Sequence, residues 1–217
     1  MLEAHLGRVF TEDPRGESAA ATRERLKGAF PPGATRRMTT LGMLVGSVLG
    51  RLDPDAQDAI VYATGYAESC ALEGYLDGFP APSPTLFQTS IHPSAVQQLM
   101  IGRQRGVREL MPLSGGALLA FHAVRACLLS ASERVLLCGG EERGTWLLEH
   151  GLASDRTFAF AASLGRVRTP ESVGTVRLSP CAGAGALDLA GLFDVMRGRE
   201  PFDAPVAPGW RLSLEWR

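Results

Sequence analysis

The spacing of apolar and polar residues changes along this chain, and this spacing distinguishes predicted strands from predicted helices. Short apolar runs bounded by turn residues predict buried strands, and longer segments with helical spacing predict helices. The predicted strands are residues 6–10, 59–65, 107–113, 134–140, 157–164, 173–178 and 210–216. The predicted helices are residues 18–30, 36–49, 68–79, 90–102, 116–129 and 186–197. Strands that alternate with helices and then follow one another predict an α/β fold with a parallel or mixed sheet and crossover helices.

Three of the predicted helices carry specific signals. In 36–49 the apolar residues form one stripe, and glycines spaced by four predict close packing against another element. In 90–102, Ser90 or Ser94 is the expected N-cap, with Pro93 in the first turn. In 116–129 almost no polar face remains, so we expect this helix to be buried on all sides. The glycines of the first helix are Gly42, Gly46 and Gly50.

The stretch 109–122 combines a predicted strand, a turn and the start of a helix. Ser114 lies at the turn and is followed by Gly115 and Gly116, so the backbone there can bend sharply. Free amide N–H groups at a helix start favour an anion or a developing negative charge. The pattern fits a nucleophile or an anion-binding corner, and it also fits a plain strand-to-helix connection, which the local sequence alone favours.

Composition narrows the class of protein. The 217 residues are 45% hydrophobic and 21% charged, which predicts one folded domain, residues 1–217. The net charge is -1 and the longest basic clusters, at 36–37 and 103–105, fit solvated faces, so no nucleic-acid partner is expected. The four cysteines form no C-x-x-C pair, which predicts a reducing cytoplasm, no zinc site and no disulfide framework. No signal peptide and no membrane span are expected.

Several segments share their order and spacing with a known family. They are Arg36-Arg37-Met38, the strand and turn at 61–65, the segment 87–95, Arg105-Gly106, the segment 114–122 and the strand 135–142. Together they resemble the N-terminal half of β-ketoacyl synthases, the condensing enzymes of fatty acid and polyketide synthesis. The resemblance implies half of a thiolase-like fold: a mixed five-stranded sheet with crossover helices, here with extra C-terminal strands.

Two departures from the family pattern bear on function. Ser114, eight residues before His122, stands where the family has its nucleophilic cysteine. A thiolate forms easily near neutral pH, whereas a serine hydroxyl needs an adjacent base. The family's H-G-T-x-T and later G-H motifs, which carry its catalytic histidines, do not occur. His92 and His122 belong to other segments and are expected to pack or form hydrogen bonds. We therefore assign no catalytic residue and expect no independent condensing activity.

The chain thus resembles chain length factors, which lack the active cysteine and pair with a ketosynthase, and in particular the short forms found with aryl-polyene and pigment polyketide clusters. The resemblance implies a ketosynthase heterodimer, a possible acyl carrier protein partner, no cofactor and no metal. The residues implied to line the partner's acyl tunnel are Phe87, Gln88, Thr89, Ile91 and His92. The residues implied to form the dimer strand are Val107, Glu109, Met111 and Leu113.

Two other interpretations stay open. Ser114 could serve an acyltransferase or acyl hydrolase as the acyl-accepting nucleophile, with helix-start amides as oxyanion donors. The turn has Pro112 where a G-x-S-x-G elbow carries its first glycine, and no Asp/His pair is placed to activate the serine. Alternatively, the chain is a non-enzymatic homodimeric scaffold.

Overall fold

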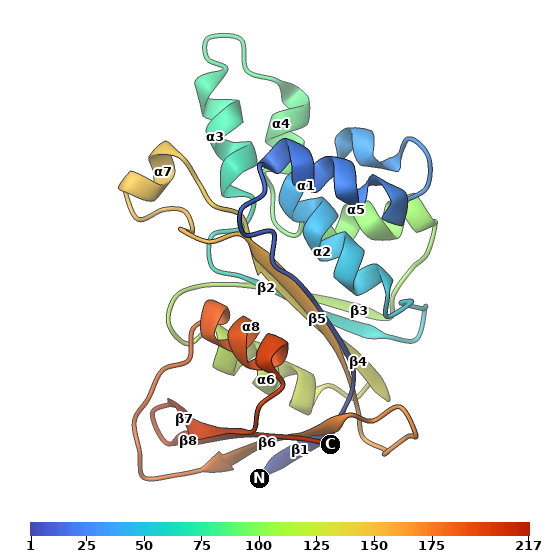
Figure 1. Cartoon of the computed structure of the whole chain (residues 1–217), viewed down its shortest axis with the longest axis vertical. Helices are drawn as coiled ribbons and strands as arrows, with labels where there is room; N and C mark the ends of the chain where they lie inside the picture. Colours follow the sequence, from blue (N-terminus) through green and yellow to red (C-terminus); the bar gives the residue numbers. More distant parts are fainter.

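One eight-stranded mixed sheet runs through the molecule, and the computed structural model describes all 217 residues (Figure 1). The strands lie in the spatial order β3-β2-β4-β5-β1-β6-β8-β7. They are β1 (Leu2–Glu12), β2 (Ala59–Thr64), β3 (Glu109–Ser114), β4 (Arg134–Glu141), β5 (Phe158–Gly165), β6 (Gly174–Pro180), β7 (Phe202–Ala207) and β8 (Trp210–Trp216).

The sheet has a mixed half and an antiparallel extension. β2 pairs in parallel with β3 and with β4, whereas every other pairing is antiparallel. The expected five strands are therefore β3-β2-β4-β5-β1, and the C-terminal strands β6, β8 and β7 continue the same sheet past β1. This arrangement confirms the predicted mixed sheet with crossover helices.

Helices cover both faces of the sheet. In chain order they are α1 (Ala19–Leu26), α2 (Thr40–Gly50), α3 (Ser69–Asp77), α4 (Pro84–Thr89), α5 (Ser94–Arg103), α6 (Leu119–Leu129), α7 (Trp146–Glu149) and α8 (Leu189–Gly198), with short 3-10 helices at Lys27–Ala29 and Ala34–Arg37. α1, α2 and α5 pack on one face, and α6 and α8 pack on the other (Figure 1). α3 and α4 project as a helical hairpin beyond the end of β2.

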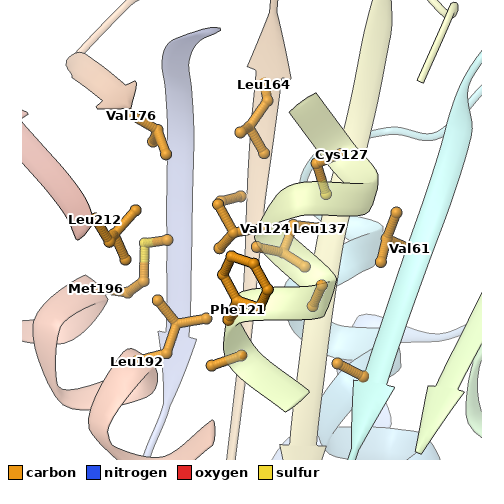
Figure 2. Packing of buried hydrophobic residues seen from close by; sticks show 14 of the residues in the cluster. Val61, Phe121, Val124, Cys127, Leu137, Leu164, Val176, Leu192, Met196 and Leu212 are labelled. Atoms are coloured by element: carbon orange, nitrogen blue, oxygen red, sulfur yellow. The ribbon is translucent and has the colours of Figure 1, made fainter. Parts of the chain in front are cut away.

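Each strand of the centre supplies side chains to both cores because successive residues point to opposite faces. In β2, Ile60 and Tyr62 belong to the core under α2 and α5, whereas Val61 and Ala63 belong to the core under α6 and α8. Figure 2 shows the second core, where Phe121 of α6 lies near the side chains of α8 over the sheet. All six residues of β2 are buried, which accounts for its uninterrupted apolar sequence.

The glycines of α2 allow close packing, as their spacing predicts. A Cβ at Gly46 would lie 2.9 Å from the Phe30 ring, and one at Gly42 would lie 3.0 Å from the Gln98 side chain of α5. The residues from Thr40 to Leu49 are all buried, so the helix is enclosed on every side rather than along one stripe.

The structure corrects the prediction for the helix after Ser114. α6 begins at Leu119, and it is not buried on all sides. Leu118 and Leu129 are 36% and 55% exposed, and His122 and Arg125 are exposed on the same flank. The sheet and α8 cover the opposite flank of α6. No other element of the chain lies over the exposed flank.

The predicted cap of α5 was wrong, and the set of predicted elements was incomplete. α5 begins at Ser94 with Pro93 in the N-cap position, and neither Ser90 nor Ser94 caps it. Instead the carboxylate of Glu68 accepts a hydrogen bond of 3.0 Å from the Ala95 amide. α4, α7 and β7 were not predicted. α4 follows a stretch rich in proline for which no element was predicted; Ser83 caps the helix and Pro84 is its first residue.

Candidate functional site

Ser114 is the last residue of β3 and is exposed. It lies in register with Thr64 at the end of β2, so the two strands end together. α6 begins five residues later, so its first amides do not lie directly behind the serine. No side chain forms a hydrogen bond with the Ser114 hydroxyl. The turn therefore presents a hydroxyl that is not hydrogen-bonded to a base that would activate it.

An open groove of about 790 Å³ lies beside this turn, along the exposed flank of α6. Its apolar lining comes mainly from Leu113, Leu118 and Leu129, and its polar side chains are Ser114, His122 and Arg125. His122 thus faces the groove, although the helix that carries it was expected to be buried on all sides. Its ring lies 5.1 Å from the ring of Phe121. No carboxylate lines the groove, so His122 has no acidic partner of the kind that orients a catalytic histidine.

Buried glutamates hold the loops behind the turn. The Glu141 carboxylate, at the end of β4, accepts from the Gly65 amide at 2.5 Å and from the Thr64 hydroxyl at 3.2 Å. Burial raises the pKa of Glu141 to about 7, although these hydrogen bonds oppose the rise. Glu73 accepts from the amides of Thr145 and Leu147, at 2.8 Å each. These carboxylates bind backbone, so their role in the chain is to position loops.

Glu68 is the most perturbed of these carboxylates. It is 3% exposed, one oxygen accepts from Ala95, and the other oxygen is buried without a partner. Burial raises its pKa to about 8. The buried hydroxyls of Tyr62 and Ser69 also lack partners. The sequence did not lead us to predict that Glu68 and Glu73 are buried. The signal that could have indicated it is that both carboxylates lie among small and apolar residues at and near the start of α3.

The five residues expected at the partner's tunnel divide into two groups. Phe87, Gln88 and Ile91 point outward, and Phe87 and Ile91 are 50% and 51% exposed. Thr89 is buried, and its hydroxyl donates to carbonyls within α4. The His92 ring packs 4.9 Å from the Tyr62 ring, its two nitrogens lack partners, and burial lowers its pKa.

β3 forms one edge of the sheet, and its outer side is unpaired. Glu109, Met111 and Leu113 alternate along it, with Met111 and Leu113 half-buried against the core under α6. Val107 lies outside β3 and packs against the core under α2, so its assignment to the strand was wrong.

The opposite edge of the sheet, β7, is protected. A Cβ at Gly183 would lie 2.9 Å from the Pro205 side chain, and one at Gly185 would lie even closer to the Pro205 backbone. The loop that carries these glycines therefore runs tightly against β7 at Pro205, which has no amide hydrogen. β3 also contains a proline, Pro112, and no strand lies along its outer side.

The structure contains no cluster of three His, Cys, Asp or Glu residues that could hold a metal ion, and all four cysteines are free. None of its helices combines the length and the apolar character that crossing a membrane requires.

No family model and no curated protein sequence matches the chain, but solved structures do. A chain in the structure of the ketosynthase ApeO in complex with its chain length factor ApeC from Xenorhabdus doucetiae superposes with a TM-score of 0.68 at 17% identity, covering 99% of this chain and 100% of that chain. A β-ketoacyl synthase from Burkholderia phymatum matches with a TM-score of 0.59 at 9% identity, over 88% of this chain and 68% of that chain. The ishigamide ketosynthase/chain length factor matches with a TM-score of 0.57 at 12% identity, over 83% and 68% respectively. The chain therefore has the thiolase-like fold of ketosynthases and chain length factors, as the sequence resemblance predicted.

Proposed function

We propose that this chain is a chain-length-factor-like subunit that does not condense acyl groups, pairs with a ketosynthase and shapes the ketosynthase's acyl tunnel. The carrying observation is Ser114. By resemblance it occupies the family's nucleophile position at the end of β3. His122 lines the same groove, but no carboxylate is there to orient it as a base for the Ser114 hydroxyl. A fold that keeps the nucleophile turn but not the nucleophile fits an auxiliary subunit better than a condensing enzyme.

Pairing through β3 is supported by the asymmetry of the two sheet edges. An unpaired edge strand carries free N–H and C=O groups, and proteins normally protect such an edge. Here a glycine-containing loop lies against the β7 edge at Pro205, whereas no such contact is seen along the β3 edge. The residues proposed for the dimer strand are Glu109, Met111 and Leu113. A strand of the partner that pairs along β3 would extend the sheet across the interface.

The exposed flank of α6 supports the same proposal. Leu118 and Leu129 together with Leu113 of β3 line one groove, so the apolar surface continues from the strand edge onto the helix. Burying apolar surface is the main source of affinity between stable subunits. We propose that the partner covers this groove.

The tunnel assignment is carried by the segment around α4. Phe87, Gln88 and Ile91 point away from the chain and are free to contact a partner, whereas Thr89 and His92 position the segment from within. We propose that the outward side chains limit the length of the acyl chain that the ketosynthase holds. The pathway is of the fatty-acid or polyketide type, as in aryl-polyene synthesis, with an acyl carrier protein delivering substrates in the cytoplasm.

Co-expression with ketosynthases from the same genome, followed by affinity purification and size-exclusion chromatography, tests the pairing. A one-to-one complex is expected, and the charged variant Leu113→Lys is expected to abolish it. Ala204→Lys places the same charge at a half-buried position of the opposite edge strand and should leave the complex intact. A ketosynthase that elutes without this chain, and makes its full product alone, would refute the proposal.

A further inference from the structure

The α3–α4 hairpin carries a patch of large apolar side chains on its outer surface. We call it the hairpin patch: Leu72, Leu76, Phe79, Phe87 and Ile91, which are 38%, 38%, 59%, 50% and 51% exposed. Leu72 and Leu76 are four residues apart on α3 and share one face of the helix. α3 and α4 stand out from the body of the molecule in Figure 1, and α7 contacts α3 on the side of Glu73.

Aromatic contacts join the two helices into one surface. The Tyr75 ring of α3 lies 5.5 Å from the Phe79 ring and 5.3 Å from the Phe87 ring of α4. A Cβ at Gly74 would lie 3.5 Å from the Leu86 side chain, so the two helices are also in contact at this point. Tyr75 therefore links Phe79 to Phe87. The exposed apolar side chains of the hairpin belong to two helices that pack together, and exposed apolar patches often mark interaction sites.

Charge is almost absent from this surface. Residues 66–92 contain only three charged side chains, Glu68, Glu73 and Asp77, and no Lys or Arg occurs between Arg51 and Arg103. Glu68 and Glu73 are buried and bind backbone amides, so Asp77 is the one exposed charge. Helices that face solvent usually carry charges on that side, whereas the cores of protein interfaces are depleted of charge and rich in aromatic residues.

The size and position of the patch fit an interface that includes β3. A stable interface buries roughly 800 Å² on each partner, more than the edge of one six-residue strand supplies. Five large side chains that are about half exposed add on the order of 400 Å². Thr64 and Ser114 are in register, so α3 leaves the sheet at the same end at which β3 finishes.

From these observations we infer that the hairpin patch is a second contact with the ketosynthase subunit, and that Leu72, Leu76 and Phe79 on the α3 side anchor it. The inference rests on the proposed function and extends the contact beyond Phe87 and Ile91. The sparse, wholly acidic charge around the patch disfavours a strongly acidic occupant, because nothing basic is present to attract one. An apolar face of the ketosynthase is the matching surface.

The test measures the affinity of the purified chain for the purified ketosynthase by biolayer interferometry. Leu76→Asp and Phe79→Asp place a charge in the patch and should each weaken binding at least tenfold. Ile101→Asp is the matched control, since Ile101 is 75% exposed on α5 outside the patch, and it should change affinity less than twofold. Far-UV circular dichroism and thermal melting of each variant verify that folding is retained.

The outcomes separate this inference from the proposed function. If the wild-type chain binds the ketosynthase and both patch variants bind equally well, the inference is overturned and the pairing stands. If the wild-type chain does not bind at all, the proposed function fails, and the inference fails with it. If the patch variants only dissociate a homodimer of this chain, the occupant is a second copy and the inference is wrong.

Discussion

Replacing Glu68 with Gln should raise the stability of the chain above neutral pH and remove a large part of its pH dependence. The carboxyl is 3% exposed and has a pKa of about 8, against 4.5 for its ordinary value, mainly because of burial. A raised pKa means that the folded state binds the proton more tightly than the unfolded chain does. The contribution of Glu68 to the free energy of unfolding is therefore largest below about pH 4.5 and falls as the pH rises from 4.5 to about 8.

The magnitude follows from proton linkage. Between pH 6 and pH 8 the unfolded state has lost this proton and the folded state keeps it, so each pH unit costs about 1.4 kcal/mol. Raising the pH from 6 to 9 therefore removes about 2 to 3 kcal/mol, which corresponds to roughly 5–10 °C in melting temperature for a chain of this size. Gln cannot ionise, and its carbonyl oxygen can still accept the hydrogen bond from Ala95.

The assay is urea denaturation of the wild type and of Glu68→Gln at pH 6 and at pH 9. The variant should be more stable than the wild type at both pH values, and its advantage should be about 2 to 3 kcal/mol larger at pH 9 than at pH 6. Asp77→Asn, an exposed carboxyl at the end of the same helix, is the control and should follow the wild type at both values. If the stabilities of Glu68→Gln and the wild type change in parallel between the two pH values, Glu68 is not the buried proton acceptor inferred here.

Three further outcomes are expected. Gly46→Ala should lower the free energy of unfolding by about 1 to 3 kcal/mol, because its Cβ would meet the Phe30 ring at 2.9 Å, whereas Gly102→Ala, 3.7 Å from its nearest neighbour, should be neutral or stabilising in urea denaturation. Phe87→Ala in the reconstituted ketosynthase pair should shift the product profile to longer chains by removing a bulky side chain from the tunnel, and an unchanged profile would contradict the tunnel assignment. Intact-mass measurement after incubation with an acyl carrier thioester should show no adduct on Ser114, and a stable adduct would favour the acyltransferase interpretation.

The elements that repeat a simple period could be predicted from sequence. β2 is buried at every position, and its uninterrupted apolar run identifies it. The glycine spacing of α2 predicted close approach, and Gly42 and Gly46 do lie against neighbouring side chains. Local signals also existed for α4, since Ser83 followed by Pro84 is a typical N-cap and first residue, but a stretch rich in proline resembles a loop.

Contacts between distant parts of the chain could not be predicted in the same way. The start of α5 has no local cap, because the acceptor is Glu68, 27 residues earlier. Nothing in the local sequence identifies such an acceptor, and the serines at 90 and 94 were the plausible but wrong choice. The positions of Glu73 and Glu141 depend likewise on backbone amides far along the chain.

Exposure of α6 is the most informative disagreement between sequence and structure. Its sequence predicts burial on all sides, yet Leu118 and Leu129 are exposed in the isolated chain. Each leucine left in water forfeits about 1.5 to 3 kcal/mol at most, in proportion to its exposed fraction. α3, for which no burial was predicted, also leaves two leucines, Leu72 and Leu76, partly exposed. The hydrophobic pattern of a sequence reflects the burial of its residues in the functional assembly. A partner that covers α6 and the hairpin patch would therefore bury the leucines that the isolated chain exposes.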